Sequence, residues 1–583
     1  MLAIIKAIAL AGYGGFGLFL VWMAATRRTP RLPISGKIPG LFFGLLTGLM
    51  LVRFGVNSPL YLAGVASATV LSAIWNRRQV VFAAGVATLS LSLAWWLQPE
   101  QQPQGWWRLA LFIPATAAML LGLNRPGRAT RWAYLVFALA GITLLTDFAA
   151  FAPGSQALAF LAHHQGAYIG SALHVLAGLV PFYDVPLQYG LGPALTVAAA
   201  CKVAGCWNGV ALLTTAATVL MGLLILRMAA DGKPTLAATV AVFVAVFLWP
   251  GFPDLGTITA ATPSVGGMRY LPVTLVAYLL FAGWFRLAIV AMIPAVLWSP
   301  EVAFMTIAVF GVHETARLGL LQSAAKTFVI VAGSFTALLL VHHLIYGVWM
   351  QPDVVIEYIL HVPGPLPIDP LSDFLFLAAA MALAGWTVLR EQGDRRALIV
   401  ATLLFAASSY YLGRSHPNNI CNLMPFVVLV ALRARPSPLV RLGIATSIAA
   451  ITLSYWTYVP FGIDRADPVE VRIAKLDPGM NEIRSHIANP DRLGIADIGQ
   501  SLNRHPDESL VWTPMDPYSL WSFVPSERRR LYIRRSAQRL RRSGWVILQG
   551  DAAKLLSEFE AGYNVAELSR TGEYTVAKLI PKP

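Results

Sequence analysis

The sequence predicts a mainly α-helical, polytopic membrane protein that carries a small C-terminal α/β domain outside the membrane. Hydrophobic residues make up 57% of the 583 positions and charged residues only 13%, with a mean hydropathy of +0.62. Apolar stretches of the ~20 residues that span a bilayer recur from the first residue to about Pro460. Charges of both signs become frequent only after that point. This composition excludes a disordered chain and argues against a wholly soluble globular protein.

Basic clusters separate the apolar stretches and fall in every second connection between them. Of the 26 Lys and Arg in residues 1–459, 20 belong to clusters at 27–37, 77–78, 125–131, 227–233, 286, 317–326, 390–396 and 433–441. Because cytoplasmic connections carry an excess of Lys and Arg, we predict that these connections are cytoplasmic. The connections 147–206, 250–268, 346–371 and 412–420, together with both termini, are then predicted to lie outside.

Apolar stretches in a bilayer are expected to be helical, because every backbone polar group must be satisfied within the segment. The pattern predicts about 16 crossings, or about 14 if the short segments 286–298 and 302–316 form a re-entrant hairpin. The N-terminal run lacks a small-residue cleavage site and is expected to be a retained helix. We predict N-terminal helices over residues 1–131, a membrane core over 132–460 and a soluble domain over 461–583.

The net charge of +15 does not indicate a nucleic-acid partner. Residues 1–459 hold 13 of the 29 acidic side chains and residues 460–583 hold 16. The basic balance therefore comes mostly from acid-poor membrane segments bordered by Lys and Arg. The three cysteines, Cys201, Cys206 and Cys421, are too few for a disulfide framework, and no CxxC pair indicates a metal or redox site.

The C-terminal segment has the pattern of a small α/β domain. Residues 509–512 and 544–548 are short apolar runs typical of buried strands, residues 552–560 favour a short helix, and residues 564–568 and 574–579 flank a Thr-Gly turn as a hairpin. About 120 residues suffice for one small core. The arginine-rich run 528–542 predicts a solvated helix face near anionic headgroups, with contact to a phosphorylated lipid or polyanionic acceptor as the alternative.

The outer connection 147–206 holds the richest set of candidate site residues. It contains His163-His164-Gln165-Gly166-Ala167-Tyr168, Gly178-Leu179-Val180-Pro181-Phe182-Tyr183-Asp184 and Leu187-Gln188-Tyr189-Gly190-Leu191-Gly192-Pro193. Loops of this length are usually functional or disordered, and the scarcity of Ser, Lys and Glu argues against disorder. Ionisable groups near a membrane are costly and tend to mark function.

The order of these motifs resembles the first outer loop of the GT-C class of glycosyltransferases. Enzymes of this class are multi-pass membrane proteins that take a sugar from a polyprenyl-phosphate carrier on the outer face. The resemblance implies a juxtamembrane helix over 191–205, a carboxylate base at the end of the first core helix or early in the loop, and inverting transfer. It also implies location in the cell (inner) membrane, with a periplasmic or extracellular C-terminal domain.

Two loop acids, Asp147 and Asp184, are the candidates for the catalytic base. Many relatives carry an acidic pair before the Gly-x-Tyr motif, where this chain has His163 and His164, so the base is not expected at those positions by analogy. Transfer to a hydroxyl needs a group that takes its proton as the oxygen attacks the anomeric carbon. The alternative for each acid is to fix a turn or cap a helix.

The leaving phosphate needs cations or hydrogen-bond donors that stabilise its charge. Arg414 with His416, at the outer end of one predicted helix, and Arg269, at the start of another, are expected to contact it, because guanidinium forks suit phosphate oxygens. Snorkelling to lipid headgroups is the alternative for these arginines.

His163, His164 and Tyr189 are expected to complete the donor site. The two histidines are also candidates for a base or for a divalent metal, and no other cofactor is predicted. Glu301 lies at a break between two short apolar segments, and such breaks normally line a cavity or pack within protein. It is a further candidate site residue.

Two other classes of function were weighed. A transporter or flippase for a lipid-linked envelope precursor typically has inverted repeats and ionisable residues at mid-membrane, but here no repeat is found and acids cluster in outer loops. A non-catalytic subunit of an envelope assembly complex would explain the His-His substitution as lost activity. The sequence favours a glycosyltransferase whose partners are the bilayer, a polyprenyl-phosphate-linked sugar and an envelope glycan, lipid or protein acceptor.

Overall fold

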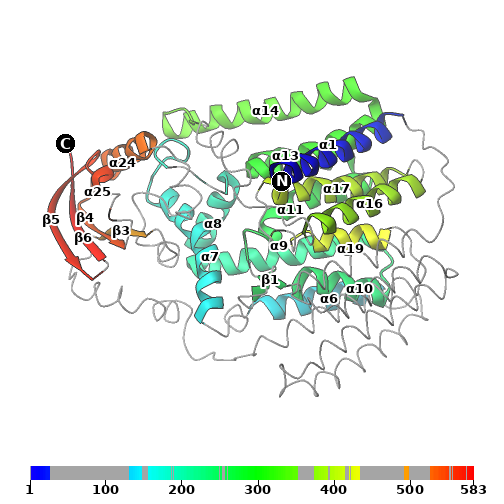
Figure 1. The fold of residues 1–583 in the computed structure, drawn as a ribbon, viewed down its shortest axis with the longest axis horizontal. Coiled ribbons are helices and arrows are strands. Elements are labelled where there is room, and N and C mark those ends of the chain that lie inside the picture. Colours follow the sequence, from blue (N-terminus) through cyan, green and yellow to red (C-terminus); the bar gives the residue numbers. More distant parts are fainter. Residues whose placement is uncertain are drawn as a thin grey trace, which may run out of the picture.

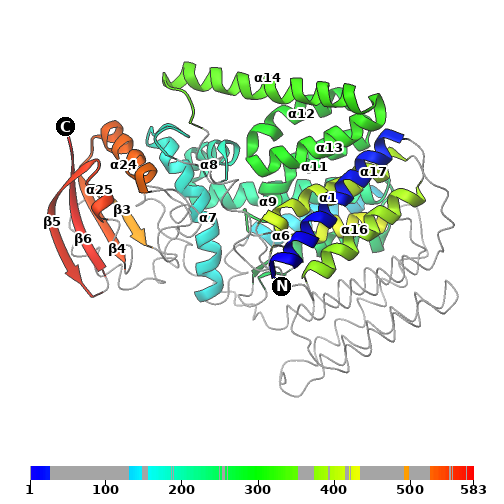
Figure 2. The same ribbon diagram turned by 45° about the horizontal axis from the view of Figure 1, so that its top comes forward.

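The computed structural model describes residues 2–26, 130–146, 155–248, 250–252, 257–351, 373–413, 419–433, 492–497, 526–549 and 553–583, with short gaps inside some of these ranges. The predicted helices of residues 27–129 and the predicted strand 509–512 lie outside this part of the chain. Figures 1 and 2 show a helical bundle with a sheet domain beyond one end of it.

The bundle contains helices that run roughly side by side, as the apolar pattern predicts. Their bounds are α1 (Leu2–Thr26), α6 (Thr130–Thr146), α7 (Ser155–Leu176), α8 (Leu191–Ala204), α9 (Cys206–Ala229), α10 (Leu236–Phe243), the π-helix η3 (Val244–Leu248), α11 (Gly267–Phe281), α12 (Phe285–Trp298), α13 (Pro300–Leu318), α14 (Leu320–Tyr346), α16 (Asp373–Arg390), α17 (Arg395–Gly413) and α19 (Met424–Arg433). Two short strands, β1 (Pro250–Phe252) and β2 (Thr257–Ile258), pair between η3 and α11.

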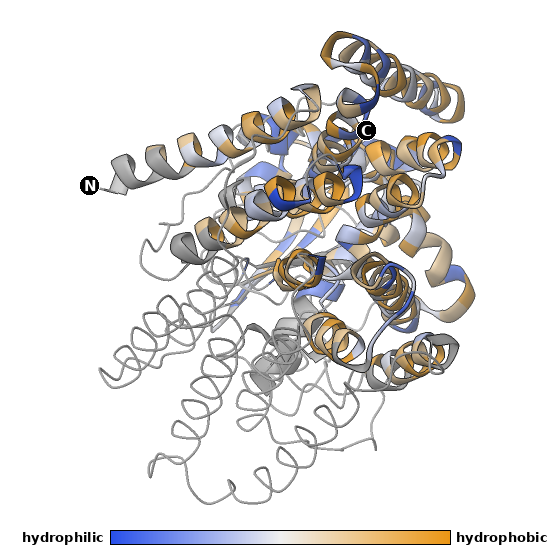
Figure 3. Cartoon of the chain, turned by 90° about the vertical axis from the view of Figure 1, so that its right-hand side faces the viewer, coloured by the Kyte–Doolittle hydropathy of each residue, from blue (hydrophilic) through white to orange (hydrophobic). Residues whose placement is uncertain are grey.

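Two described helices, α9 and α14, have the length and hydropathy of a membrane span, and shorter apolar helices accompany them. Most of α14 is exposed, including Leu321, Phe328 and Leu344. Figure 3 shows hydrophobic residues on the outward faces of the helices as well as inside the bundle, which suits contact with lipid. The total of about 14–16 crossings stays a prediction.

Helix α11 lies at the centre of the bundle, in contact with α9, α12, α13 and α17. Tyr270 on α11, Phe310 on α13 and Phe426 on α19 are fully buried in the shared core. Gly267, the first residue of α11, permits the closest approach: a Cβ atom there would lie 2.3 Å from the backbone nitrogen of Thr218 on α9. The start of α11 is therefore held directly against α9.

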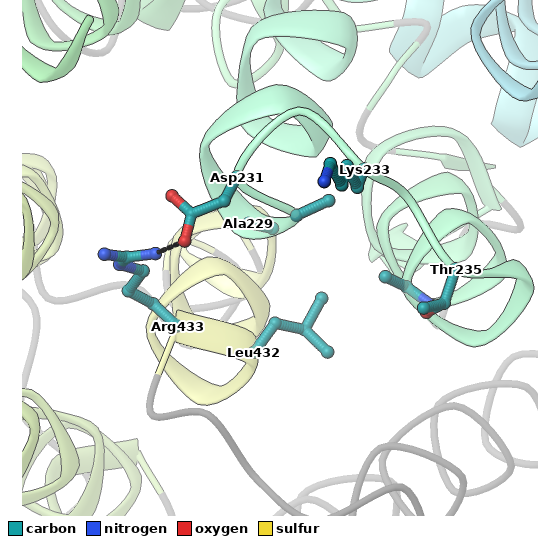
Figure 4. A pocket seen from close by; sticks show the side chains of 8 residues that line it. Ala229, Asp231, Lys233, Thr235, Leu432 and Arg433 are labelled. Carbon is teal, nitrogen blue, oxygen red and sulfur yellow. Dashed lines mark hydrogen bonds and ion pairs between the residues drawn. The ribbon is translucent and has the colours of Figure 1, made fainter. Parts of the chain in front are cut away.

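Three of the predicted cytoplasmic clusters meet at one end of the bundle. Arg433, at the end of α19 and only 2% exposed, donates to Asp231 Oδ2 (2.5 Å) and Asp394 Oδ2 (2.8 Å). Arg396 also pairs with Asp231, at 3.4 Å. Figure 4 shows Asp231 and Arg433 beside a pocket that Lys233 and other residues line. The ends of α9, α17 and α19 thus lie together, as the alternation of basic clusters requires.

The predicted break between segments 286–298 and 302–316 is confirmed as the junction of α12 and α13. Ser299 is the N-cap of α13, and its Oγ accepts a hydrogen bond from the Val302 amide (3.3 Å). Pro300 occupies the first turn, where its missing N–H costs nothing. The start of α13 is therefore specified by local sequence.

The C-terminal domain is a four-stranded sheet covered by helix α24 (Ser526–Leu540). Its strands are β3 (Arg492–Asp497), β4 (Gly544–Gln549), β5 (Tyr563–Thr571) and β6 (Tyr574–Pro581), in the order β3-β4-β6-β5, with β3 and β4 parallel and the other pairs antiparallel. The short helix α25 (Leu556–Phe559) precedes β5. The predicted strand at 544–548, the short helix and the hairpin are confirmed, and the arginine-rich run forms α24.

A disulfide between Cys201 and Cys206 closes the corner between α8 and α9. Three cysteines predicted no disulfide framework, and this single bond joins residues only five positions apart, so it links one corner rather than the whole fold. Disulfides persist in oxidising compartments outside the cytoplasm. Such a bond is compatible with the predicted outer location of the 147–206 connection, which stays a prediction.

Replacing Gly267 by Ala is expected to lower the stability of the protein, because the new methyl group overlaps the α9 backbone. Overpacking of this kind typically costs about 1–3 kcal/mol. Thermal unfolding of the purified protein measures the effect. Gly311→Ala, in the interior of α13 with no atom within 4 Å of the added Cβ, is the matched control and should leave the unfolding temperature unchanged or raise it. Equal tolerance of both substitutions would contradict the close α9–α11 contact.

Alkylation of denatured protein that was prepared without reductant is expected to modify one of its three cysteines, and all three after reduction. Intact-mass measurement distinguishes the two states. Cys206→Ser should expose Cys201 and raise the number modified without reductant by one. Modification of all three cysteines in the unreduced native chain would show that the bond does not form.

Candidate functional site

Two motifs of the outer connection come together in the structure. Tyr168, from the Gly-x-Tyr motif, lies on α7, and Tyr189, from the Tyr-Gly-x-x-Pro motif, precedes α8. Their rings stack with centroids 4.4 Å apart and planes at 13°. Both tyrosines interact with Arg269 in the first turn of α11. The motifs that carry the family resemblance therefore form one wall of a shared site.

Arg269 is the charged group at the centre of this cluster. Its side chain is only 4% exposed, and its guanidinium carbon lies 3.8 Å from the centre of the Tyr410 ring and 5.7 Å from that of Tyr189. Among the described residues, no carboxylate forms an ion pair with Arg269 and its Nη1 has no hydrogen-bond partner. A buried cation with spare donor capacity is suited to an anionic ligand.

The backbone that carries Arg269 is fixed by α9. Thr218 Oγ1 accepts a hydrogen bond from the Gly267 amide (3.2 Å) and donates one to the Ala260 carbonyl (3.4 Å). Arg269 also lies in the first turn of its helix, where free amides and the helix dipole favour negative charge. Both the side chain and its position thus produce positive potential at this point.

Glu301 enters the same site from the break between α12 and α13. Ser299 Oγ donates to Glu301 Oε2 (3.2 Å). The carboxylate interacts electrostatically with Arg269 and Tyr168 without forming a direct ion pair among the described residues. Glu301 is therefore placed to balance part of the Arg269 charge.

Two glycines let the loop approach this break. Gly190, at φ +87°, and Gly192 leave so little room that a Cβ atom would lie 2.3 Å from the Trp298 carbonyl oxygen and 2.5 Å from the Trp298 ring, respectively. Trp298 Nε1 in turn donates to the Met268 carbonyl, at 3.1 Å. The indole thereby joins the start of α8 to the residue before Arg269.

His164 lies on the loop side of the site, where its Nδ1 is 2.8 Å from Ser264 Oγ. The side chain of His163 lies outside the described part of the structure. Among the described residues, no group of three or more His, Cys, Asp or Glu could hold a metal ion. His164 therefore contacts the segment before α11, and its predicted roles as base, metal ligand or phosphate contact stay predictions.

Asp184 lies at the junction of the outer connection with the C-terminal domain. Its carboxylate accepts the Val180 amide (2.8 Å) and forms an ion pair with Arg539 of α24. Burial raises the pKa of the Asp184 carboxyl, while Val180 and Arg539 act against that rise. These contacts favour a structural role, and catalysis by Asp184 stays a prediction.

Asp147, Arg414 and His416 lie outside the described residues, and their roles stay predictions. Asp147 directly follows Thr146, the last residue of α6. Two residues before Asp147, the Leu145 carbonyl accepts a hydrogen bond from Thr215 Oγ1 on α9 (3.5 Å). Thr215 lies one helical turn before Thr218, which holds the start of α11.

The structure adds site residues that the sequence analysis did not select. Tyr168 stands in the Gly-x-Tyr motif, and Tyr410 stands four residues before Arg414, so both had a signal in their neighbourhood. Ser264, the partner of His164, had none. Its contact joins residues 100 positions apart.

No protein-family model matches this chain, and no curated protein matches its sequence. Solved structures with a similar course include ArnT from Cupriavidus metallidurans in the apo state, with 12% identity and a TM-score of 0.44 over 78% of this chain and 98% of that one. For ArnT bound to undecaprenyl phosphate the identity is 13% and the TM-score 0.37, over 77% and 98%. At such low identity and TM-score, the function of this chain is inferred from its own residues.

Proposed function

We propose that this chain is a membrane glycosyltransferase that moves a sugar from a polyprenyl-phosphate carrier to a cell-envelope acceptor on the non-cytoplasmic face. The observation that carries the proposal is the burial of Arg269 beside the tyrosines of the two loop motifs. Its Nη1 has no hydrogen-bond partner among the described residues.

Arg269 is proposed to bind the phosphate of the carrier. Burying a cation is costly unless a partner compensates it, and a guanidinium offers two parallel donors to phosphate oxygens. Glu301 interacts with Arg269 but forms no direct ion pair with it among the described residues, which leaves the guanidinium available. Arg414 and His416 are proposed to contact the same phosphate from the outer end of α17.

The aromatic wall is proposed to hold the apolar parts of the donor. Tyr168, Tyr189 and Tyr410 surround the guanidinium on the described sides. Tyrosine rings offer large apolar faces and a polar hydroxyl at the edge. Such surfaces suit a molecule that joins an isoprenoid chain, a phosphate and a sugar.

The transfer step follows from these roles. The acceptor hydroxyl oxygen attacks the anomeric carbon while a carboxylate takes its proton, and the bond from that carbon to the phosphate oxygen breaks. The phosphate leaves with the electron pair, and Arg269 stabilises its growing charge. Attack opposite the leaving group inverts the anomeric centre.

We assign the base to Asp147 rather than to Glu301. The Glu301 carboxylate already accepts a hydrogen bond from the Ser299 hydroxyl and interacts electrostatically with Arg269, which suits it to orient the arginine. Asp147 comes directly after α6, and the Leu145 carbonyl near the end of α6 is hydrogen-bonded to Thr215 on α9. Thr215 lies one helical turn before Thr218, which binds the first amide of α11. Asp184 is the second candidate, and its contacts with α24 make it the weaker one.

Arg269→Gln is expected to weaken binding of a polyprenyl-phosphate analogue about 10- to 100-fold, because loss of a charge-assisted hydrogen bond typically costs ~1.5–3 kcal/mol. Binding to the purified protein in detergent or nanodiscs measures this. Arg286→Gln is the control, because Arg286 is an exposed arginine in the first turn of α12 and belongs to the predicted cytoplasmic clusters. Equal affinity of the native chain and Arg269→Gln would refute the phosphate role.

Asp147→Asn is expected to reduce kcat about 10²- to 10⁴-fold, the usual effect of losing a general base, while the donor still binds. Glu301→Gln should instead raise the donor KM, because it disturbs the partner of Arg269. Steady-state kinetics with a polyprenyl-phosphate sugar separate the two effects. A kcat for Asp147→Asn that equals the native value would move the base to Asp184, and His164 and Glu301 follow only if Asp184→Asn also leaves kcat unchanged.

A further inference from the structure

We infer that helix α24 of the C-terminal domain positions the transfer site, with Arg535 and Arg539 as positioning residues and Asp184 as their anchor in the outer connection. The effect on turnover rests on the proposed function, whereas the effect on loop mobility does not. The inference begins from the contacts between α24 and residues 179–190, which are called here the positioning turn.

Three residues of α24 make polar contacts with the positioning turn. Arg539 forms an ion pair with the Asp184 carboxylate, and Ser536 Oγ donates to the Asp184 carbonyl, at 3.3 Å. Arg535 Nη1 donates to the Tyr183 carbonyl (2.9 Å), and its guanidinium lies 4.0 Å from the centre of the Tyr183 ring. One face of α24 therefore binds two residues of the turn, Tyr183 and Asp184.

Apolar packing supports the same junction. Tyr532 of α24 is buried in a small cluster with residues of the positioning turn and the start of α8: Leu179, Phe182, Val185, Leu187 and Ala194. This cluster is separate from the core of the C-terminal domain, to which Ile533 and Ala537 of the same helix belong. Helix α24 therefore packs against its own sheet with one side and the turn with another.

The exit of α14 completes the junction. Arg535 Nη1 also donates to Gln351 Oε1 (2.8 Å), and the Gln351 amide donates to the Phe182 carbonyl (2.7 Å). His342 Nε2 lies 3.0 Å from the Pro181 carbonyl oxygen. Arg535 therefore links α24, the positioning turn and the end of a membrane-length helix at one point.

The positioning turn has a backbone that needs such support. Phe182 has φ +56°, a left-handed conformation that a bulky residue rarely adopts. Conformations of this kind persist where surrounding contacts hold them. The contacts of Phe182, Tyr183 and Asp184 with α14 and α24 supply that support.

The turn leads directly to the site. Tyr189 follows Asp184 by five residues, stacks on Tyr168 and faces Arg269. Gly190 then packs against the Trp298 carbonyl with no room for a side chain. A shift of the turn would therefore move Tyr189 relative to Arg269. By this route α24 sets the geometry of the donor site without touching the donor.

The arginines of α24 divide into two groups, which provides a control. Arg535 and Arg539 contact the positioning turn, whereas Arg530 and Arg534 are exposed and form no hydrogen bond, ion pair or ring contact with the described residues. Arg534→Gln removes a charge next to Arg535 without removing any contact to the turn. It separates positioning from the general charge of the helix.

Hydrogen exchange of the full chain in nanodiscs tests the junction without any need for activity. Arg535→Gln and Arg539→Gln should speed exchange of amides in residues 179–190, and Arg534→Gln should not. The unfolding temperature is measured beside it, because a merely structural role would lower that temperature and loosen the whole domain. Unchanged exchange at 179–190 in both Arg535→Gln and Arg539→Gln would overturn the inference, including when the native chain shows no transferase activity.

Kinetics then test whether the junction acts on the site. Arg535→Gln and Arg539→Gln should raise the donor KM about 10- to 100-fold, the range for loss of a charge-assisted contact, with a smaller change in kcat. Asp184→Asn should add little in the Arg539→Gln background, since coupled residues are not additive. A further 10²- to 10⁴-fold loss of kcat in that background would instead identify Asp184 as the base and overturn its role as anchor. Unchanged donor KM in both arginine variants would overturn the positioning role.

Discussion

The burial of one guanidinium that forms no ion pair with the described residues constrains much of the architecture around it. A cation is costly to remove from water, so its surroundings must compensate it. Around Arg269 this compensation comes from tyrosine faces and from Glu301 at electrostatic range. These groups come from α7, the loop before α8, α11, α13 and α17, which explains why so many elements converge there. The close approaches of Gly190 and Gly267 bring those elements near enough.

The two ends of the bundle treat buried arginine differently. Arg433 is as buried as Arg269, but it is in direct contact with Asp231 and Asp394 and so holds the ends of α9, α17 and α19 together. Arg269 has aromatic faces where Arg433 has carboxylates. The carboxylates neutralise the charge of Arg433 within the protein, whereas the tyrosine faces leave the charge of Arg269 available to a ligand. This contrast, rather than the presence of an arginine, identifies the end at which an anionic ligand is expected.

Local patterns predicted the elements better than they predicted the site. Capping residues predict the helix break at Ser299, turn residues predict the hairpin of β5 and β6, and periodicity predicts the helical arginine run. Each of these signals lies in neighbouring positions of the sequence. Arg269 and Glu301 were selected because charged residues at the ends of apolar segments are rare, and Tyr189 because it stands in a loop motif; their functional roles stay predictions. Ser264 and the stacking of Tyr168 on Tyr189 depend on contacts between distant segments, which a single sequence does not reveal.

Asp184 illustrates why a motif alone is a poor guide to the role of a carboxylate. In sequence it closes a Gly-x-x-Pro-aromatic-x-Asp motif in the loop where a base is expected. In the structure that motif makes a turn whose backbone carbonyls and terminal carboxylate face α24, so the acid is held by Arg539. A catalytic base must reach the acceptor proton, and a carboxylate that already binds a guanidinium and a backbone amide has little freedom to do so. An aspartate can serve either as a catalytic base or as a structural anchor. Only the partner that it binds, here Arg539 from the far end of the chain, distinguishes the two roles.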